Sequence, residues 1–336
     1  MCSSDLEEFW KEWKALEGSG SGERGIFNRF ACRSKMKDIN REDKVDWLTN
    51  PCAEIMLRSN QFCNLTEVVV RPDDTQNILL EKIRVATILG TWQSALDNLP
   101  KLRPIWKKNC QEERLLGVSM TGILDNNLLN GRGDKQNLKT LLETLRDHAI
   151  DTNKQHAKKI KINPSASVTA IKPSGTSSAL NATASGCHPR HSKYYIRRVR
   201  GAKTDPITKL FMKEGVVHEQ CNYSNESIVF SFPFKSPDKA LLREDLTAIE
   251  HLELYMIYQN HYTTHKPSIT VSIKNNEWDQ VGEFVFENLP NFAGVSFLPY
   301  SEHTYSQAPF EECSKEIYED PLAKTPTKID WDSAGY

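Results

Sequence analysis

The stretch Asn50-Pro51-Cys52-Ala53-Glu54-Ile55, with Cys63-Asn64-Leu65 shortly after it, is the most informative part of this sequence. Cys52 and Glu54 are two positions apart, so their side chains point to the same side of an extended or loop segment. Pro51 stiffens the approach to this pair. Cys63 directly precedes an expected strand. Two thiols and a carboxylate that converge at the end of a strand suit redox chemistry with the help of a general base.

Each of these residues also has an ordinary interpretation. Cys52 and Cys63 taken alone fit buried structural thiols, and Glu54 fits a surface charge. The combination Asn-Pro-Cys-x-Glu-Ile followed by Cys-Asn-Leu is much harder to explain in that way.

Composition excludes several classes of protein. The chain has 336 residues, with 43 Lys and Arg against 44 Asp and Glu, a net charge of −1. This balance argues against a nucleic-acid or membrane partner, because nonspecific binding to either needs a basic excess. The eight cysteines are sparse and none falls in a C-x-x-C pair. With no apparent secretory signal at the start, this cysteine usage predicts a cytoplasmic protein with reduced thiols.

Hydrophobic patterning predicts an α/β fold. Apolar residues recur at helical spacing over residues 6–16, before a Gly-rich stretch at residues 18–22. Strands and helices then alternate, which argues for parallel βαβ units in an open sheet or part of a barrel. The expected strands cover residues 65–70, 115–120, 167–171, 228–232, 269–273 and 294–298, and the expected helices cover residues 75–96, 137–159, 206–214, 240–262 and 277–288.

A Ser- and Thr-rich turn follows the expected strand at residues 167–171. Ser174, Gly175, Thr176 and Ser177 offer hydroxyls and unhindered backbone N–H groups, which suit the phosphates of a nucleotide. The alternative is a plain Ser/Thr turn.

Two histidines four positions apart, His261 and His265, have the spacing of a metal pair. No Glu stands between them in an H-E-x-x-H arrangement, so we expect no metal site.

Several segments, in this order along the chain, resemble the large catalytic subunit of ribonucleotide reductases. The resemblance is greatest to the adenosylcobalamin-dependent (class II) ribonucleoside-triphosphate reductases, and it covers most of the chain. The matching segments are residues 22–29, 50–67, 115–122, 172–177, 188–200 and 294–299.

The resemblance implies the second half of a ten-stranded α/β barrel, with a finger loop through its centre that carries the radical cysteine at its tip. That cysteine is Cys52 here. By this resemblance, a Cys52 thiyl radical takes the 3′ hydrogen of the ribose, Glu54 takes the proton of the 3′ hydroxyl, and Asn50 hydrogen-bonds the substrate near the same carbons. Cys63 is one of two thiols that reduce the 2′ position and become a disulfide.

The same resemblance implies ribonucleotides as substrates, with triphosphates favoured, and deoxyribonucleotides for DNA synthesis as products. It places the substrate phosphates on Ser174, Gly175, Thr176 and Ser177. It implies adenosylcobalamin as the cofactor, with residues 190–300 toward it, and a thioredoxin-like reductant.

We expect three segments along the chain. Residues 1–49 form an N-terminal helix and Gly-rich loop leading into the barrel, residues 50–310 form the C-terminal half of the barrel, and residues 311–336 form a polar tail. Members of the family are much longer, so we expect a split reductase whose N-terminal half is a separate partner. A half barrel exposes sheet edges and an apolar face that such a partner covers.

Two other interpretations stay open. In the first, the chain is a noncatalytic, decayed fragment that binds nucleotide or a reductase partner. In the second, it is a reductase half whose radical comes from a metal-containing subunit.

Overall fold

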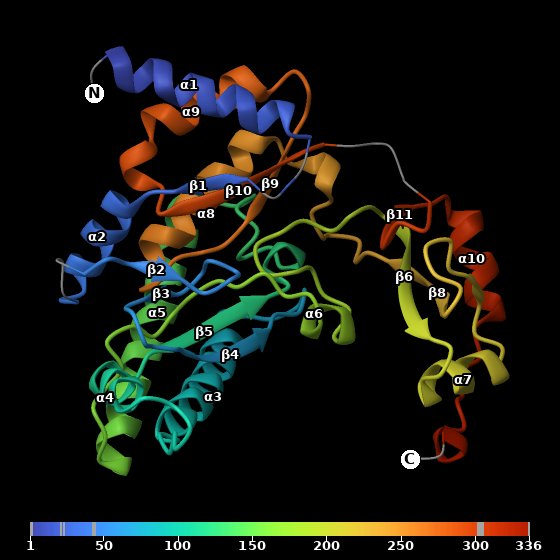
Figure 1. Cartoon of the computed structure of the whole chain (residues 1–336), viewed down its shortest axis with the longest axis horizontal. Helices are drawn as coiled ribbons and strands as arrows, with labels where there is room; N and C mark the ends of the chain where they lie inside the picture. Colours follow the sequence, from blue (N-terminus) through green and yellow to red (C-terminus); the bar gives the residue numbers. More distant parts are fainter. Residues whose placement is uncertain (1–2, 21, 23, 42–44, 301–305, 335–336) are drawn as a thin grey trace. The chain divides into compact units, whose positions relative to one another are not determined.

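The computed structural model describes residues 3–20, 22, 24–41, 45–300 and 306–334. It divides into two compact units, called unit 1 (Met1–Pro189 and Leu246–Tyr300) and unit 2 (Arg190–Asp245 and Ser301–Tyr336) (Figure 1). Helices and strands alternate along most of the chain, so the predicted α/β class is confirmed.

Unit 1 contains most of the elements that the sequence predicts. Its helices are α1 (Ser3–Gly18), α2 (Arg29–Asp38), α3 (Gln76–Ser94), α4 (Pro104–Glu113), α5 (Lys135–Ile160), α6 (Ser177–Leu180), α8 (Ala248–His261) and α9 (Trp278–Glu287), with 3-10 turns η1 (Ile123–Asp125) and η3 (Leu289–Asn291). Its strands are β1 (Gly25–Phe27), β2 (Leu48–Thr49), β3 (Met56–Leu57), β4 (Asn64–Val69), β5 (Leu116–Thr121), β9 (Thr270–Ile273) and β10 (Gly294–Pro299).

In unit 1, β4 pairs with β5, residues 167–171 lie on the other side of β5, and β9, β10 and β1 form a separate sheet in that order. β4 and β5 are parallel, as are β9 and β10, whereas β1 is antiparallel to β10. Residues 167–171 make only isolated parallel bridges, Val118 opposite Thr169 and Ile171 opposite Pro267. The predicted strand at residues 167–171 is therefore a bridged segment and not a regular strand, because the segment opposite Ile171, around Pro267, is a loop.

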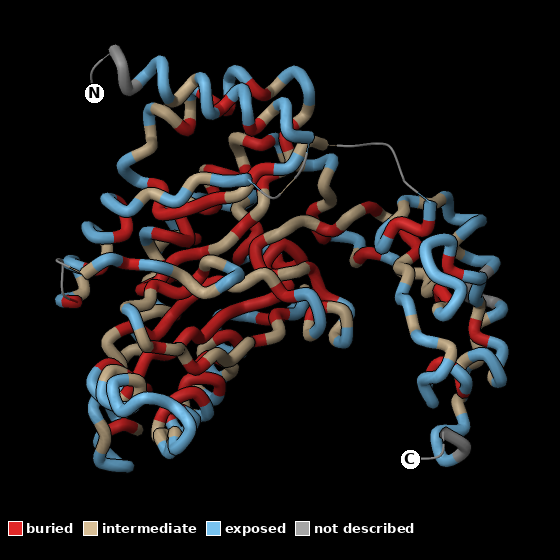
Figure 2. Tube along the Cα trace, viewed as in Figure 1, coloured by how far each residue is buried: buried red, intermediate tan, exposed pale blue. Residues whose placement is uncertain are grey.

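Helices bury the central strands of unit 1. α3 packs on β4, β5 and α5, and α8 packs on α5 and β9. Every residue of β5 is buried, as expected for a parallel strand covered on both faces. Figure 2 shows the buried positions concentrated where these helices meet the strands. The core of unit 1 thus forms a rigid base beneath β2 and β3.

Unit 2 is built on an antiparallel sheet. Its elements are β6 (Tyr194–Ala202), α7 (Pro206–Lys213), β7 (His218–Gln220), β8 (Ser227–Lys235), η2 (Arg243–Asp245), β11 (Phe310–Glu312), α10 (Lys315–Lys324) and η4 (Trp331–Ala334), and the strand order is β11-β6-β8-β7. The expectation of parallel units is wrong here, because the predicted strand at residues 228–232 belongs to β8, which pairs antiparallel with β6. The polar tail forms a helix, α10, whose Tyr318 ring contacts Tyr194.

The helix predicted over residues 240–262 begins eight residues later. Thr247 caps α8 by accepting a hydrogen bond from the Glu250 N–H at 3.2 Å, and the Glu250 carboxylate accepts from the Thr247 N–H at 2.9 Å. This reciprocal capping box fixes the first turn of the helix. The preceding residues form η2 instead.

No helix in the described part of the chain is both long enough and apolar enough to cross a bilayer.

The capping box of α8 provides a stability test. We expect Thr247→Ala to lower the free energy of unfolding by about 1 kcal/mol, because the Glu250 N–H loses its acceptor. The matched control is Thr75→Ala, since Thr75 precedes α3 but makes no side-chain capping hydrogen bond. Urea denaturation followed by circular dichroism measures both variants, and equal losses in the two would contradict the role assigned to the box.

Candidate functional site

β2 and β3 form a short antiparallel hairpin that carries the Asn-Pro-Cys-x-Glu motif at its tip. The Ala53 N–H donates to the Asn50 carbonyl at 2.9 Å and closes the turn. Ala53 has a φ of +62°, in the left-handed region that costs energy for a residue with a Cβ atom. The turn leaves the Cys52 thiol exposed. The surrounding contacts therefore hold this tip in a shape that the local sequence does not favour.

Glu54 lies directly below the tip and has no exposed surface. Its Oε1 accepts from Asn50 Nδ2 at 2.8 Å and from Lys172 Nζ at 3.2 Å. Its Oε2 is buried and has no hydrogen-bond partner among the residues that the structure describes. Leaving such an oxygen unpaired costs about 1–3 kcal/mol or more, so this atom is a natural acceptor for a hydroxyl of a bound ligand.

Two further contacts fix the hairpin from below. Asn50 Oδ1 accepts from the Ile55 N–H at 3.1 Å, which ties both sides of the turn together. Lys266 is almost fully buried, and its ammonium donates to the Ala53 carbonyl. Burial lowers the pKa of Lys266 to about 8, although the nearby Cys32 and Glu54 oppose this shift. Lys266 is therefore a second cation that interacts with Glu54 electrostatically.

The base of the hairpin rests on a buried ion pair. Arg41 donates through Nε and Nη2 to both carboxylate oxygens of Glu113, at 2.9 and 2.8 Å. Its Nη1 donates to the Met56 carbonyl of β3 at 2.9 Å, and its guanidinium lies 4.3 Å from the centroid of the Trp47 ring. Arg41 thus links the hairpin to α4.

Cys63 and His265 come together at the start of β4. Cys63 is half-buried, and its Sγ lies 4.0 Å from His265 Nε2. Burial raises the pKa of the Cys63 thiol well above its usual value, and the charge of Glu54 adds to that shift. This thiol is protonated at neutral pH, as a hydrogen donor must be.

His265 is a neutral ring held between two backbone groups. The Met56 N–H donates to its Nδ1 at 3.2 Å, and its Nε2 lies 2.9 Å from the Leu116 carbonyl, to which it donates. Burial holds its pKa well below the usual 6.5. His261 lies instead against Glu143, with Nδ1 2.8 Å from Oε1. The two histidines do not converge on a common point, and the described residues contain no cluster of metal-ligating side chains.

The proposed phosphate turn is ordered by a carboxylate. The Ser174 and Ser177 hydroxyls both donate to Glu67 Oε2, and the Ser178 N–H donates to Ser174 Oγ at 2.9 Å. Gly175 and Thr176 are exposed. The helix that follows, α6, has only four residues, too short to supply an N-terminal dipole of any weight. The groups free to meet a phosphate are therefore those of Gly175 and Thr176.

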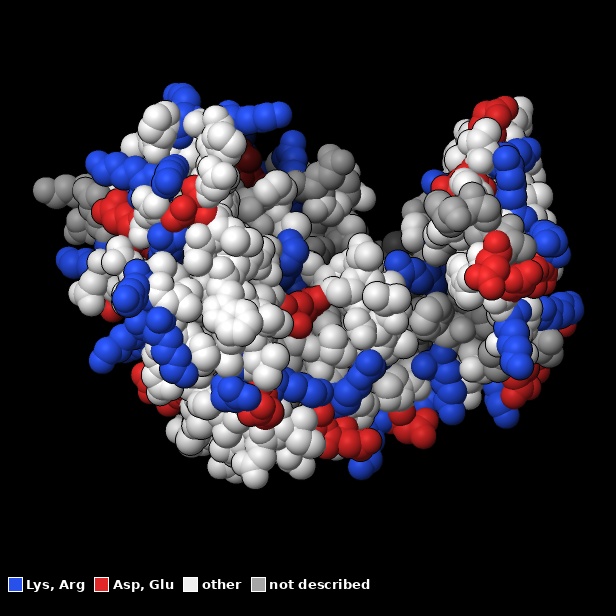
Figure 3. Space-filling view, turned by 90° about the horizontal axis from the view of Figure 1, so that it is seen from below, with Lys and Arg blue, Asp and Glu red and all other residues white. Residues whose placement is uncertain are grey.

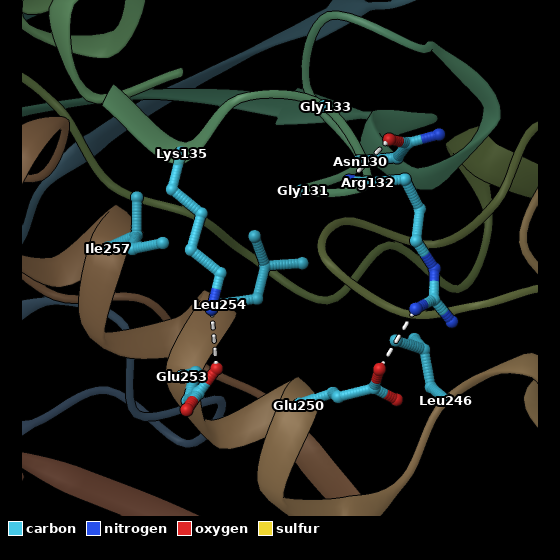
Figure 4. Close-up of a pocket in the computed structure, with 10 residues that line it drawn as sticks. All are labelled: Asn130, Gly131, Arg132, Gly133, Lys135, Leu246, Glu250, Glu253, Leu254 and Ile257. Atoms are coloured by element: carbon cyan, nitrogen blue, oxygen red, sulfur yellow. Dashed lines mark hydrogen bonds and ion pairs between the residues drawn. The ribbon is translucent and has the colours of Figure 1, made fainter. Parts of the chain in front are cut away.

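Figure 4 shows a different pocket of unit 1, with a volume of about 230 Å³, between the start of α5 and α8. Two ion pairs close it, Arg132 to Glu250 at 2.9 Å and Lys135 to Glu253 at 2.7 Å. It contains none of the predicted site residues, and its charges are balanced.

The structure brings Asn50, Cys52 and Glu54 together in one hairpin and places Cys63 next to His265. Sequence reasoning missed Lys172, Lys266 and Arg41, and it weighed His265 only as a metal ligand. The position of Lys172 just before the phosphate turn is the one signal that pointed toward it.

Comparison with solved structures defines the class of fold. The crystal structure of a B12-dependent (class II) ribonucleotide reductase matches with a TM-score of 0.78 at 22% identity, covering 96% of this chain and 49% of that one. The α subunit of the Actinobacillus ureae class Id reductase matches with a TM-score of 0.55 at 15% identity, covering 88% of this chain and 64% of that one. The fold is therefore shared with ribonucleotide reductases.

The relatives that are similar to this chain in sequence belong to one group of these enzymes. The adenosylcobalamin-dependent ribonucleoside-triphosphate reductase of Lactobacillus gasseri is 26% identical over 331 residues, which is 89% of this chain and 44% of that protein. The protein of that name from Euglena gracilis is 27% identical over 295 residues, 85% of this chain and 39% of its own length. No protein-family model matches. The resemblance inferred from the motifs is confirmed, and the chain spans less than half the length of these relatives.

His265 makes the stability of unit 1 depend on pH. Its folded pKa lies below the unfolded value of 6.5, so the unfolded chain binds a proton that the folded chain does not. The stability that the neutral ring contributes is present above pH 6.5 and is lost as the pH falls below it. We expect the free energy of unfolding to fall more steeply in the wild type than in His265→Gln between about pH 6.5 and 5.5. The difference between the two slopes is at most about 1.4 kcal/mol per pH unit. Parallel slopes in urea denaturation would contradict this account of His265.

Proposed function

We propose that this chain is the catalytic half of a ribonucleotide reductase that converts ribonucleotides, with triphosphates favoured, to 2′-deoxyribonucleotides. One observation carries the proposal. The buried Glu54 has an Oε2 without a hydrogen-bond partner among the described residues, and it lies two positions after the exposed Cys52 in the same hairpin tip. The names of the relatives and the shared fold support the same chemistry.

The hairpin residues have distinct tasks in this reaction. A thiyl radical at Cys52 takes the 3′ hydrogen of the ribose, and Glu54 accepts the proton of the 3′ hydroxyl at Oε2. Asn50 holds Oε1 of the same carboxylate through a 2.8 Å hydrogen bond, which leaves Oε2 directed to the substrate. A preorganised acceptor of this kind needs no rearrangement when charge develops on the substrate oxygen.

Cys63 takes part in the reduction of the 2′ carbon. The 2′ hydroxyl leaves as water, and two thiols supply two electrons and become a disulfide. Cys63 is one of them, and the second comes from the part of the reductase outside this chain. A thioredoxin-like protein then reduces the disulfide by thiol exchange.

Adenosylcobalamin is the proposed cofactor, and it would supply the one-electron chemistry that generates the Cys52 radical. The site fits this demand in one respect, because the reacting thiol is exposed at the hairpin tip and open to an external group. Glu54 below the tip is closed to solvent. Residues 190–300 stay our candidate for the cobalamin contacts.

The partner proposed is a separate N-terminal half, and one face of unit 1 suits it. In the described part of the chain β4 pairs with β5 alone, so its other edge has no strand partner there. A groove of about 420 Å³ runs between β4 and α3. Figure 3, seen from the side on which α3 lies in Figure 1, shows a broad uncharged area on unit 1. α3 and the segment directly after it carry exposed apolar residues. These are Ile78, Val85, Leu89, Trp92 and, beyond the helix, Leu96.

A cytoplasmic location agrees with the state of the thiols. All seven cysteines among the described residues are free. Free thiols persist in the reducing environment of the cytosol.

The proposed activity is tested by coexpression with the neighbouring open reading frame and an assay of deoxynucleotide formation with and without adenosylcobalamin. We expect turnover only with the cofactor, and we expect Cys52→Ser to abolish it because the oxygen cannot replace the sulfur radical. Cys313→Ser is the control, since that thiol lies in unit 2. Normal turnover by Cys52→Ser, or turnover independent of the cofactor, would overturn the proposal.

The partner surface has its own test. Trp92 is 52% exposed, and we expect Trp92→Glu to reduce the copurifying N-terminal half about tenfold or more, because a charge in an apolar interface is strongly unfavourable. Ile317→Glu, at an equally exposed apolar position in unit 2, should leave copurification unchanged. An equal effect of both variants in size-exclusion chromatography would speak against α3 as the docking face.

A further inference from the structure

Lys172 comes from a distant part of the chain and reaches the hairpin that carries Cys52 and Glu54. Its Nζ donates to Glu54 Oε1 at 3.2 Å, and its ammonium is close enough to Cys52 to interact with it electrostatically. Its backbone N–H donates to Ser119 Oγ at 2.9 Å, which anchors it to β5. The ammonium therefore reaches the hairpin from a fixed base.

The electrostatics of the site require a cation at this place. Glu54 has no exposed surface, and a buried carboxylate without a counter-charge is strongly unfavourable. Burial alone would lower the pKa of Lys172, but its interactions with Cys52 and Glu54 outweigh that effect and leave the pKa above its usual 10.5. Lys172 therefore stays charged at neutral pH.

Lys266 does not replace this contact. It faces Glu54 from behind the tip, but its ammonium donates to the Ala53 carbonyl rather than to the carboxylate. Its pKa is lowered to about 8 by burial. Among the described residues, Lys172 is therefore the cation in direct contact with the Glu54 carboxylate.

We propose that Lys172 is a positioning residue of this site, whose ammonium fixes the Glu54 carboxylate through their ion pair and lies near the Cys52 thiol. The assignment of a reaction to these groups rests on the proposed function. Because Lys172 directly precedes Pro173 and Ser174, one short segment carries both the ammonium and the phosphate turn. Its ammonium is bonded to Glu54, so we expect it to act on turnover rather than on nucleotide binding.

The proposed proximity of the Lys172 ammonium to the Cys52 thiol can be tested on the isolated chain, without an activity assay. Iodoacetamide alkylates the thiolate with loss of iodide, and mass spectrometry of the tryptic peptide gives the rate at Cys52. At mildly alkaline pH we expect Lys172→Met to slow this alkylation about tenfold, because the ammonium is lost and the Glu54 charge stays. Lys172→Arg keeps the charge and should stay within about threefold of the wild type.

Lys82→Met is the matched control for alkylation. Lys82 has a side chain 32% exposed and pairs with Asp74, against 30% for Lys172. We expect this variant to leave the rate at Cys52 unchanged. An unchanged rate in Lys172→Met, or an equal drop in Lys82→Met, would overturn the proposed contact.

Turnover in the reconstituted complex tests the positioning role. We expect Lys172→Met to lower kcat about 10- to 100-fold, the loss typical of a charged hydrogen bond, with KM within about threefold. Lys172→Arg should recover most of kcat. In a Glu54→Gln background, Lys172→Met should change kcat less than about threefold, since the partner charge is gone.

Two results would overturn this role. A rise in KM alone would make Lys172 a phosphate contact, and additive losses in the double variant would make the two residues independent. The double variant also removes both charges, so it separates loss of positioning from misfolding. If no deoxynucleotide forms at all, the proposed function fails, whereas the alkylation rates still decide the contact.

Discussion

A carboxylate without solvent exposure lies under the tip of a two-stranded hairpin, and the geometry of the site depends on how its charge is held. Burying Glu54 is costly unless opposite charge and hydrogen bonds compensate it. Asn50 and Lys172 satisfy one of its oxygens, and the other stays unpaired. The arrangement leaves one buried carboxylate oxygen as a hydrogen-bond acceptor for the substrate hydroxyl in the reaction that we propose.

The fold of unit 1 provides the supports that such a site needs. Arg41 and the adjacent pair His265 and Lys266 reach the hairpin from two distant segments, and each of the three bonds a backbone group of residues 53–56. β5 is adjacent to the same region through Gly117, where an added Cβ would lie 3.5 Å from Cys63 Sγ. Many buried contacts thus hold a turn that includes a left-handed Ala53. The rigidity of the tip comes from long-range contacts and not from local preference.

The sequence predicted the parts whose signal is local. The periodicity of α3 and α5 and the alternation of elements in unit 1 follow from spacing along the chain. It did not predict the antiparallel pairing of β6 and β8, since a single strand pattern does not say which partner it will find. Lys266 and Arg41 were missed for a similar reason, because a lone cation in a sequence gives no sign that it will be buried against a distant carbonyl.

A structure of the reconstituted complex with a bound ribonucleotide tests the central claim most directly. The measurement is the distance from Glu54 Oε2 to the 3′ oxygen of the ribose. We expect this oxygen within hydrogen-bonding distance of Oε2, with the Cys52 sulfur facing the 3′ carbon. A nucleotide bound elsewhere, with Oε2 still unpaired, would contradict the account.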